Sequence, residues 1–216
     1  MAEVAPGLRL AGVRIARGGE TLVALDANVG PGEVLTVMGP SGSGKSTLLS
    51  VIVGTVAPAF RVEGRVVLDG RDITPLPPEA RRVGILFQDD LLFPHLSVGG
   101  NLAFALPYAL RGRAARRRAI EAALADVGLA GFADRDPATL SGGQKARVAL
   151  MRMLISEPRA LLLDEPFSRL DAALRDQVRG LVFDRARARG LPVLLVTHDE
   201  ADAAAAGGLV HRLAGG

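Results

Sequence analysis

The stretch "MGPSGSGKST", residues 38–47, decides how the rest of the sequence is interpreted. It contains Lys45, one of only two lysines among the 26 Lys and Arg residues of the chain. Gly39, Gly44, Lys45 and Ser46 match the pattern G-x-x-x-x-G-K-[ST] at every fixed position. Glycines allow the backbone to curl until several N–H groups point toward one anion. The stretch therefore predicts a phosphate-binding loop.

Lysine suits this loop better than arginine for a physical reason. Its ammonium is a compact charge on a flexible stem and can reach between the β- and γ-phosphates of a nucleotide, where a planar guanidinium fits poorly. Ser46 offers a hydroxyl suited to Mg²⁺. A flexible glycine loop with a chance lysine is the alternative. We expect the whole loop to bind the triphosphate, through Gly39, Pro40, Ser41, Gly42, Ser43, Gly44, Lys45, Ser46 and Thr47.

The segments around the loop have the periodicity of an α/β protein. The mostly apolar "VLTVM" (34–38) predicts a buried strand, and "KSTLLSVIVG" (45–54) predicts a helix. Upstream, "LRLAGVRI" (8–15) and "TLVALDANV" (21–29) alternate apolar and polar residues, as half-buried antiparallel strands do. Strand, loop and helix come in the order that a phosphate-binding loop requires.

The remainder of the chain continues this alternation, with one interruption. From about residue 96 to residue 131, alanine, leucine and arginine recur at helical spacing, which predicts a helical subdomain inserted into the α/β body. Strands alternating with helices predict a largely parallel sheet with right-handed crossovers. The other expected strands are 65–70, 83–88, 159–164 and 191–198, and the other expected helices are 143–158 and 172–190.

Composition narrows the class of protein. The 216 residues are 49% hydrophobic and 23% charged, as in an ordinary globular domain, and the lack of cysteine excludes disulfides and thiolate chemistry. The N-terminus does not have the pattern of a secretory signal, and no apolar run reaches the length of a membrane span. The net charge is +3, and we interpret the basic stretch 111–120 as a solvated helix face, with phosphate contact as the alternative.

Two adjacent acids follow another buried strand. In "ALLLDEP" (160–166), Asp164 and Glu165 come directly after four apolar residues. Ligands of open α/β sheets bind at the carboxyl ends of the strands, so these acids are expected near the phosphate loop. Asp164 would hold magnesium, mostly through water, and Glu165 would polarise an attacking water. An acidic turn without function is the alternative, and the glycine loop argues against it.

An ordered set of motifs carries a resemblance to a known family. "GPSGSGKST" (39–47), "ILFQ" (85–88), "LSGGQ" (140–144), "LLLDEP" (161–166), "RLD" (169–171) and "VTHD" (196–199) resemble the nucleotide-binding subunit of ATP-binding cassette (ABC) transporters. The resemblance extends from about residue 8 to residue 200. "LSGGQ" is its most specific element.

The resemblance implies one ABC ATPase domain over residues 1–216. Residues 1–88 and 159–216 would form a RecA-like core with the antiparallel β part, and residues 89–158 the helical subdomain that carries the signature. The fold class expected is therefore α/β: a P-loop NTPase core with a mostly parallel sheet, an N-terminal antiparallel β subdomain and an inserted helical subdomain.

The resemblance also implies a head-to-tail dimer with two ATP molecules at its interface. Each ATP, with Mg²⁺, would lie between the phosphate loop of one subunit and the signature of the other. "LSGGQ" opens a predicted helix, so Ser141 and the amides of Gly142 and Gly143 can face a γ-phosphate, with Gln144 beside them. A flexible linker or a simple helix cap is the alternative.

Three single residues take their expected roles from the family. Gln88 resembles the glutamine that touches magnesium and the attacking water. His198 matches the histidine that contacts the γ-phosphate, and Asp171 resembles the acid that links the two sites across the dimer. The catalytic residues implied are thus Glu165, His198, Gln88 and Lys45, and the metal ligands Ser46, Gln88 and Asp164.

"EPFSRLDAALR" (165–175) resembles, more narrowly, bacterial importers of small solutes, including thiamine, iron, polyamine and maltose systems. The partners implied are transmembrane permease subunits and a solute-binding protein, with no nucleic acid, at the cytoplasmic face of the cell membrane. Leu92 or Phe93 is expected to line the groove that receives a short permease helix. The appended regulatory domain of some importer ATPases is not expected here.

One position departs from the family pattern. The family usually stacks adenine on an aromatic side chain about 25 residues before the phosphate loop, but the matching region offers only Ala16 and Arg17. Our hypothesis is that Arg17 lies over the ring instead. If it does not, selection for ATP over GTP should be poor.

Two other functions are compatible with parts of the pattern. A cassette ATPase acting on DNA or ribosomes usually carries two cassettes or a long coiled coil between the motifs, and the sequence has neither. A nucleotide-binding regulator without turnover would not need Glu165 and His198. The transported solute is chosen by the permease and any binding protein, so this sequence does not specify it.

Overall fold

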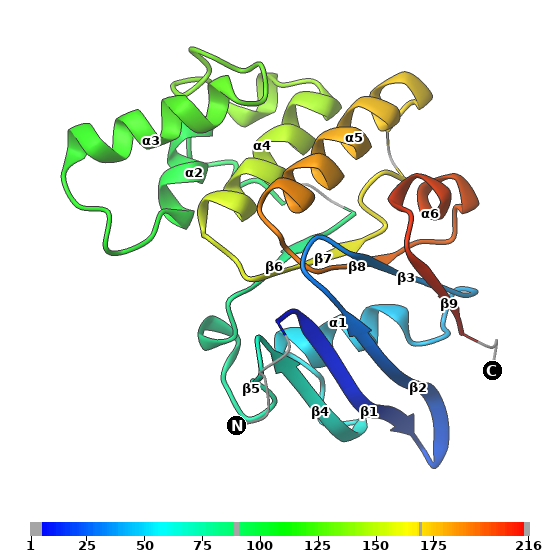
Figure 1. Cartoon of the computed structure of the whole chain (residues 1–216). Coiled ribbons are helices and arrows are strands. Elements are labelled where there is room, and N and C mark those ends of the chain that lie inside the picture. Colours follow the sequence, from blue (N-terminus) through cyan, green and yellow to red (C-terminus); the bar gives the residue numbers. More distant parts are fainter. Residues whose placement is uncertain (1–5, 89–90, 169, 214–216) are drawn as a thin grey trace. The chain divides into compact units, whose positions relative to one another are not determined.

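The computed structural model describes residues 6–88, 91–168 and 170–213, and the chain forms two compact units (Figure 1). The first unit comprises residues 1–85, 159–165 and 183–216, and the second comprises residues 86–158 and 166–182. The second unit thus includes the segment expected to be the helical subdomain, together with residues 166–182, which follow Asp164 and Glu165.

A five-stranded sheet forms the centre of the first unit. Its ladders β7–β8, β8–β3 and β3–β9 are all parallel, which confirms the expected mostly parallel sheet. β3, β7 and β8 are almost entirely buried because their sequences are continuous apolar runs. In spatial order the strands are β6 (Val83–Leu86), β7 (Ala160–Asp164), β8 (Val193–Val196), β3 (Val34–Met38) and β9 (Leu209–Arg212).

An antiparallel sheet is the other layer of the first unit. β1 pairs with both β2 and β4, and its residues alternate between buried and exposed, as the sequence predicted. The hydrophobic face of this sheet points inward, because every second residue of β1 is apolar. In spatial order the strands are β2 (Glu20–Val29), β1 (Leu8–Arg17), β4 (Arg61–Leu68) and β5 (Arg71–Asp72).

Helix α1 (Lys45–Val53) lies between the two sheets and begins at the lysine of the glycine-rich loop (Figure 1). Its buried residues Leu48, Leu49 and Ile52 belong to one apolar core with side chains from both sheets. This packing fixes the helix axis, and therefore the position of the loop at its N-terminal end.

The C-terminal end of α1 is fixed by Arg81, which is only 6% exposed. Its guanidinium donates to the carbonyls of Val51 and Ile52 in the last turn of α1 at 2.8 and 2.9 Å, and to those of Leu76 and Thr74 at 2.8 and 2.6 Å. Burial lowers the pKa of the Arg81 guanidinium, and the charge of the nearby Asp72 opposes that shift. The arginine satisfies helix-end carbonyls that have no partner within the helix.

Helix α6 (Glu200–Ala206) and the last part of α5 (Ala172–Ala188) complete the first unit. β5, α6 and β9 were not predicted from the sequence. β5 has two residues, α6 is an alanine-rich single helix of seven residues, and β9 lies at an edge with Leu209 and Val210 exposed. None of the three has the clear periodicity on which the other predictions rested.

The second unit is helical, as the sequence predicted. α2 (Val98–Ala105), α3 (Arg113–Ala125) and α4 (Gly142–Ile155) pack together around buried leucines and valines, joined by the first part of α5. Asn101 is fully buried and holds the turn before α2, since its amide exchanges hydrogen bonds with the backbone of Phe93 at 2.8 and 3.2 Å. No helix within residues 6–88, 91–168 and 170–213 is long and apolar enough to cross a bilayer.

Candidate functional site

The glycine-rich loop connects β3 to α1 at the carboxyl edge of the parallel sheet. Gly44 has φ +90°, and a Cβ atom at this position would come 2.8 Å from Val23 Cγ2. A Cβ atom on Gly39 would come 2.7 Å from Ser43 Oγ. Both fixed glycines of the motif are therefore required by space, and Gly44 also by its backbone angle.

Lys45 lies across the mouth of the loop and is 7% exposed. Its Nζ donates to the carbonyl oxygens of Gly39 at 2.7 Å and Pro40 at 2.8 Å. An ammonium has three N–H donors, so one remains for a further acceptor. The loop itself thus holds the charge in place at its opening.

Ser43 and the backbone around it fit an anionic ligand. The Ser43 Oγ atom is buried and has no hydrogen-bond partner among the described residues. A buried hydroxyl without a partner costs free energy, so its presence indicates a site that a ligand completes. The N-terminal end of α1 has no side-chain cap, which leaves its first amides available to the same ligand.

Asp164 ends β7 and lies beside the start of α1. The pKa of Asp164 is raised above its usual value, mainly because the carboxyl is buried, and the charge of Glu165 adds to this shift. Hydrogen bonding from Ser46 and the charge of Lys45 oppose it. The hydroxyl of Ser46 and the carboxylate of Asp164 are thus brought together, as the sequence analysis expected for two of its metal ligands. Both are hard oxygen donors of the kind that Mg²⁺ prefers.

Glu165 contacts His198 across neighbouring strands. Its Oε1 atom lies 3.1 Å from His198 Nδ1, with side-chain exposures of 23% and 63%. Glu165 follows β7 and His198 follows β8, and the amide of Glu165 donates to Val196 O at 2.9 Å. Glu165 has φ +45°, a left-handed conformation that is costly for a residue with a Cβ atom. A carboxylate oriented by an imidazole can accept a proton from water.

Gln88 lies two residues beyond β6 and is exposed. Asp89 and Asp90, which follow it, lie outside the described residues, as does Arg169 of the "RLD" motif. β6 pairs with β7 in the sheet order, so Gln88 follows a strand next to the one that carries Asp164. Its role as a metal ligand stays a prediction.

The signature motif opens α4 in the second unit and forms a capping box. The amide of Ser141 donates to Gln144 Oε1 at 3.0 Å, and the amide of Gln144 donates to Ser141 Oγ at 3.3 Å. A Cβ atom on Gly143 would come 2.4 Å from Leu174 Cδ1, whereas one on Gly142 would meet no atom within 4 Å. The capping box pairs the amides of Ser141 and Gln144. The amides of Gly142 and Gly143 lie between them and have no carbonyl partner within the helix.

Asp171 lies beside this motif. A hollow of about 460 Å³ is bordered by Ser141, Gly142, Gly143, Asp171 and side chains of α5. Asp171 directly precedes α5, and its Oδ1 accepts a hydrogen bond from the amide of Leu174 at 3.0 Å, as the side chain of an N-cap residue does. The structure therefore brings Asp171 together with the signature residues within one unit.

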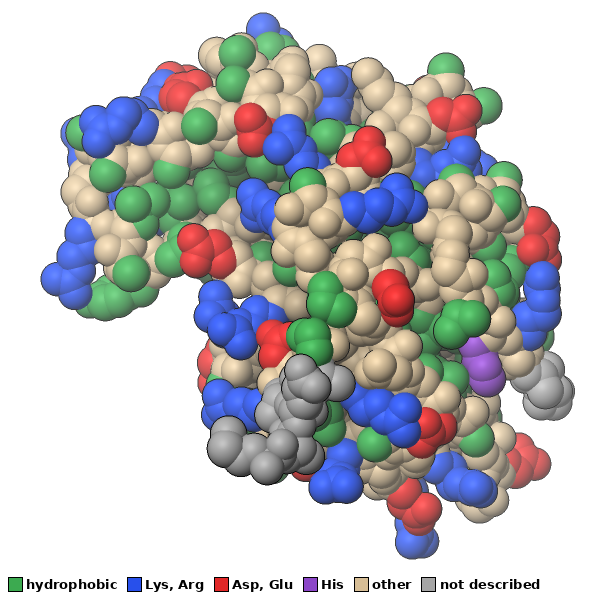
Figure 2. All heavy atoms as spheres, viewed as in Figure 1, with side chains coloured by type: hydrophobic (Ala, Val, Ile, Leu, Met, Phe, Trp, Pro, Cys, Tyr) green, Lys and Arg blue, Asp and Glu red, His purple; other side chains and the backbone are tan. Residues whose placement is uncertain are grey.

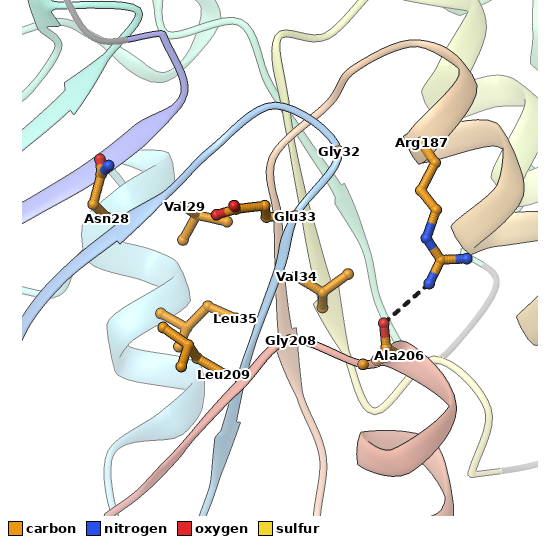
Figure 3. Close-up of a pocket in the computed structure, with 11 residues that line it drawn as sticks. Asn28, Val29, Gly32, Glu33, Val34, Leu35, Arg187, Ala206, Gly208 and Leu209 are labelled. Carbon is orange, nitrogen blue, oxygen red and sulfur yellow. Dashed lines mark hydrogen bonds between the residues drawn. The ribbon is translucent and has the colours of Figure 1, made fainter.

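A second hollow, of about 370 Å³, lies at the amino ends of β3 and β9 (Figure 3). Glu33, Arg187 and Leu209 are among its lining residues, and Arg187 donates to Ala206 O at 3.2 Å. The phosphate loop follows the opposite, carboxyl end of β3. The hollow was not predicted from the sequence, because it is bordered by short segments without a recognisable motif.

Arg17 ends β1, and its guanidinium carbon lies 5.6 Å from the centre of the Phe60 ring. The β1–β2 hairpin approaches the phosphate loop, as the short distance from Val23 to Gly44 shows. Phe60 is thus an aromatic partner of Arg17 that the sequence analysis missed, because it lies 43 positions away along the chain and outside any motif.

A parallel α/β sheet, a phosphate-binding loop at its carboxyl edge and two acids on the next-but-one strand define a P-loop nucleotide triphosphatase. The family profile described as "ABC transporter" matches residues 22–168. The chain belongs to the ABC transporter family, as an ATP-binding and ATP-hydrolysing subunit.

Curated relatives agree with this assignment. The chain is 54% identical over 181 residues to the uncharacterized ABC transporter ATP-binding protein YnjD of Escherichia coli, covering 84% of this chain and 83% of that protein. It is 48% identical over 187 residues to the thiamine import ATP-binding protein ThiQ of Cereibacter sphaeroides, covering 87% and 80%. It is 46% identical over 180 residues to the spermidine/putrescine import ATP-binding protein PotA of Frankia alni, covering 83% and 38%.

Proposed function

We propose that this chain powers an importer of a small solute, as one of two copies that bind ATP head to tail at the cytoplasmic face of the cell membrane. The observation that carries the proposal is the convergence of Lys45, Ser46, Asp164, Glu165 and His198 at one edge of the parallel sheet. The printed names of the thiamine and polyamine relatives support import of a small solute.

The phosphate loop would hold the β- and γ-phosphates of ATP. Lys45 keeps one N–H donor beyond those that it gives to Gly39 and Pro40, and that donor would bind a phosphate oxygen. Ser43 would give its partnerless hydroxyl to the same ligand. Because these donors are fixed before the ligand arrives, little reorganisation is needed to stabilise charge on the γ-phosphate.

Glu165 would act on the attacking water. Its carboxylate can accept the proton of that water, and His198 would orient it through the 3.1 Å contact. The strained backbone of Glu165 holds the carboxylate at the edge of the sheet. His198 would also be the group that contacts the γ-phosphate.

Ser46 and Asp164 would hold a magnesium ion, with Gln88 as a third ligand. The ion would neutralise phosphate charge when bound. Ser46 lies close enough to Asp164 to lower the pKa of its carboxyl, so these two oxygen donors are near each other.

The signature would complete the site of the second copy. Ser141 and the amides of Gly142 and Gly143 border a hollow that is open to a ligand, and α4 presents the positive end of its dipole there. Asp171, on the wall of the same hollow, would transmit the state of one site to the other. Gln144 would act through its capping bond to Ser141.

Permease subunits and a solute-binding protein would be the partners in the membrane. Phe93 packs edge-on against Phe104, with ring centres 5.0 Å apart, and Leu92 and Phe93 are half-buried. Leu92 or Phe93 would line the groove for a permease helix. The substitution Phe93→Asp should then abolish assembly with the permease while ATP binding persists, and unchanged assembly would remove Phe93 from the interface.

The base of the nucleotide would be held by Arg17. Its guanidinium lies over Phe60, which is compatible with a second flat ring on its other face. Because an arginine stack is not specific for adenine, the affinities for ATP and GTP should differ by less than about tenfold. A strong preference for ATP would contradict this role.

The substitution Glu165→Gln tests the proposed function. It should lower the rate of phosphate release by about a hundredfold or more, since general-base catalysis contributes on that scale, while ATP still binds and traps dimers detectable by gel filtration. Glu157→Gln is a matched control, because Glu157 is also a glutamate with a positive φ, of +53°. Rapid turnover by the Glu165 variant would exclude that residue as the base.

A further inference from the structure

A third hollow, of about 210 Å³, lies within the first unit and has no part in the proposed function. It is found at the amino ends of β6 and β7, because Arg82 and Arg159 directly precede these strands and border it. The phosphate loop, the two adjacent acids and the proposed permease contacts Leu92 and Phe93 all follow the carboxyl ends of strands instead. We call this feature the arginine hollow, since its wall contains Arg71, Arg81, Arg82 and Arg159.

Positive charge exceeds negative charge around the arginine hollow. Asp69 is the one acid among the described residues that line it. Both of its oxygens are engaged, since Oδ1 accepts from the amide of Gly7 at 3.1 Å and Oδ2 lies 3.3 Å from Arg159 Nη1. Asp72 does not line the hollow, but its charge acts on Arg81. Cations thus outnumber acids by four to two even when Asp72 is counted, and such a site attracts anions. Figure 2 shows basic side chains gathered near β5 and the beginning of β6, with acidic ones among them.

Arg81 brings a buried charge to this wall, since it is only 6% exposed. Its guanidinium is tightly held, because a Cβ atom on Gly54 would come 2.6 Å from Arg81 Cζ. Four of its five N–H groups donate to the carbonyls that end α1 and to those of Leu76 and Thr74, and the fifth has no acceptor among the described residues. Neutral carbonyls offset a buried charge only in part, so an anion in the hollow would stabilise it.

Arg71 and Arg159 are the more accessible donors of the arginine hollow. Arg71 is exposed and forms no ion pair or hydrogen bond with the residues that the structure describes. Arg159 is 56% exposed, and its guanidinium gives one hydrogen bond, to Asp69. Since a guanidinium carries five N–H groups, both arginines keep donors for a further acceptor.

The backbone is strained at two positions of the same wall. Asp69 has φ +48° and Arg82 has φ +55°, left-handed values that are costly for residues with a Cβ atom. Strained backbone of this kind is concentrated at active sites and ligand-binding sites, and Glu165, the proposed base, is another example in this chain. The carbonyl of Arg82 accepts from the amide of Arg159 at 2.8 Å, which fixes these two arginines next to each other.

We propose that the arginine hollow binds a phosphate group, either as inorganic phosphate or as a phosphate ester of a small molecule. Guanidinium groups present pairs of parallel N–H donors that match the oxygens of a phosphate. The volume of about 210 Å³ lies below the range of about 300 to 1,000 Å³ that is typical of sites for larger ligands. A single phosphate group therefore fits better than a whole nucleotide. This site is separate from the phosphate loop and does not depend on the proposed function.

Calorimetric titration with inorganic phosphate tests the proposal. The phosphate loop also attracts phosphate, so the measurement uses the full chain with Lys45→Ala, at constant ionic strength. This chain should bind one phosphate, and chloride at least about tenfold more weakly, because only an oxyanion matches the paired donors. Adding Arg71→Gln and Arg159→Gln should weaken phosphate binding by at least about tenfold, since charge-assisted hydrogen bonds are lost. No saturable binding of phosphate by the Lys45→Ala chain would overturn the proposal.

A matched pair of arginines on β1 provides the control. Arg9 forms an ion pair with Asp26 at 2.7 Å, as Arg159 does with Asp69, and Arg14 is exposed without an ion pair or hydrogen bond among the described residues, as Arg71 is. Arg9→Gln with Arg14→Gln, in the same Lys45→Ala chain, should change phosphate affinity less than about twofold. Equal losses in both double variants would mean that net charge alone drives binding, and would overturn the proposal. If the first double variant unfolds, Arg71→Gln alone should still weaken binding at least about threefold.

The source of the phosphate group is distinguished by a second titration, with glycerol 3-phosphate. Tighter binding of this ester than of inorganic phosphate would assign the arginine hollow to phosphate esters, and weaker binding would assign it to the free ion. The outcome is also separable from that of the proposed function. With Lys45 in place and without added phosphate, the variant with Arg71→Gln and Arg159→Gln should hydrolyse ATP as fast as the unchanged chain, because both arginines lie away from the carboxyl edge of the sheet.

Discussion

The phosphate loop and the signature motif are both glycine-rich starts of helices, but their polar groups are satisfied differently. In the phosphate loop, Ser43 Oγ is buried without a partner among the described residues, and α1 has no side-chain cap. In the signature, Ser141 and Gln144 cap each other. The first helix start has no capping side chain, whereas the second is capped by its own residues.

In the proposed function, this difference would decide how each motif meets a phosphate. The loop would enclose its ligand and gain hydrogen bonds that the protein alone does not provide. The signature is stable without a ligand and only presents two amides and a hydroxyl at the wall of a hollow. A motif of the second kind can approach and leave a nucleotide without local unfolding, as reversible closure of a dimer requires.

The largest effect should come from the lysine of the loop. Both Lys45→Ala and Lys45→Arg should lower ATP hydrolysis by on the order of a hundredfold to a thousandfold, because one fixed electrostatic donor is lost or misplaced. Phosphate release and nucleotide binding measure the effect. The arginine variant sharpens the comparison, since a purely electrostatic requirement would let it retain activity.

A smaller effect should follow from releasing the far end of the phosphate-loop helix. The substitution Arg81→Met leaves four backbone carbonyls without their donor and should lower the free energy of unfolding by about 3 kcal/mol. Urea unfolding measures this change. The neighbouring exposed Arg82, substituted in the same way, should cost less than about 1 kcal/mol, and equal losses would show that Arg81 has no special role.

The two glycines of the signature should separate stability from activity. Gly143→Ala forces Leu174 to move and should cost about 2 kcal/mol of unfolding free energy. Gly142→Ala meets no atom and should leave stability unchanged or slightly raised. If the hollow accepts the partner's nucleotide, Gly142→Ala should still lower ATP hydrolysis. A fully active Gly142 variant would indicate that this amide does not approach the phosphate.

The smallest effect concerns an ion pair on the surface of the second unit. Hydrogen bonding and charge attraction from Arg117 lower the pKa of Asp134 below its usual value. The pair therefore stabilises the fold above about pH 4, the ordinary pKa of aspartate, and its contribution is lost as the pH falls through the lowered pKa. The melting temperature should differ slightly between the unchanged chain and Asp134→Asn at pH 6, and the difference should vanish at low pH or in high salt.

The fold class was predictable from the sequence because its signals are local and strong. The continuous apolar runs of β3, β7 and β8 indicated buried parallel strands, and the alternation in β1 and β2 indicated a half-exposed antiparallel pair. The fixed positions of the glycine loop then located the carboxyl edge of the sheet. The structure confirms the fold class on all these points.

Other features depend on contacts that no local pattern encodes. Arg81 looks like any other basic residue in the sequence, and only the fold shows that its guanidinium ends α1. The stacking of Arg17 on Phe60 joins segments that are distant along the chain. The exposure of Tyr108 was not predicted either, since an aromatic residue in a sequence is by default expected to be buried.

The left-handed backbone at Glu165 implies a conflict between durability and turnover at this position. Only glycine adopts a φ of +45° without a steric penalty, and any other residue pays about 1 kcal/mol or more. A Glu165→Gly enzyme should consequently melt at a higher temperature than its parent while being unable to turn over ATP. If Glu165 is the base, as proposed, the best residue for the fold and the best residue for the reaction are different amino acids, and selection for heat resistance alone would remove the one that the reaction needs.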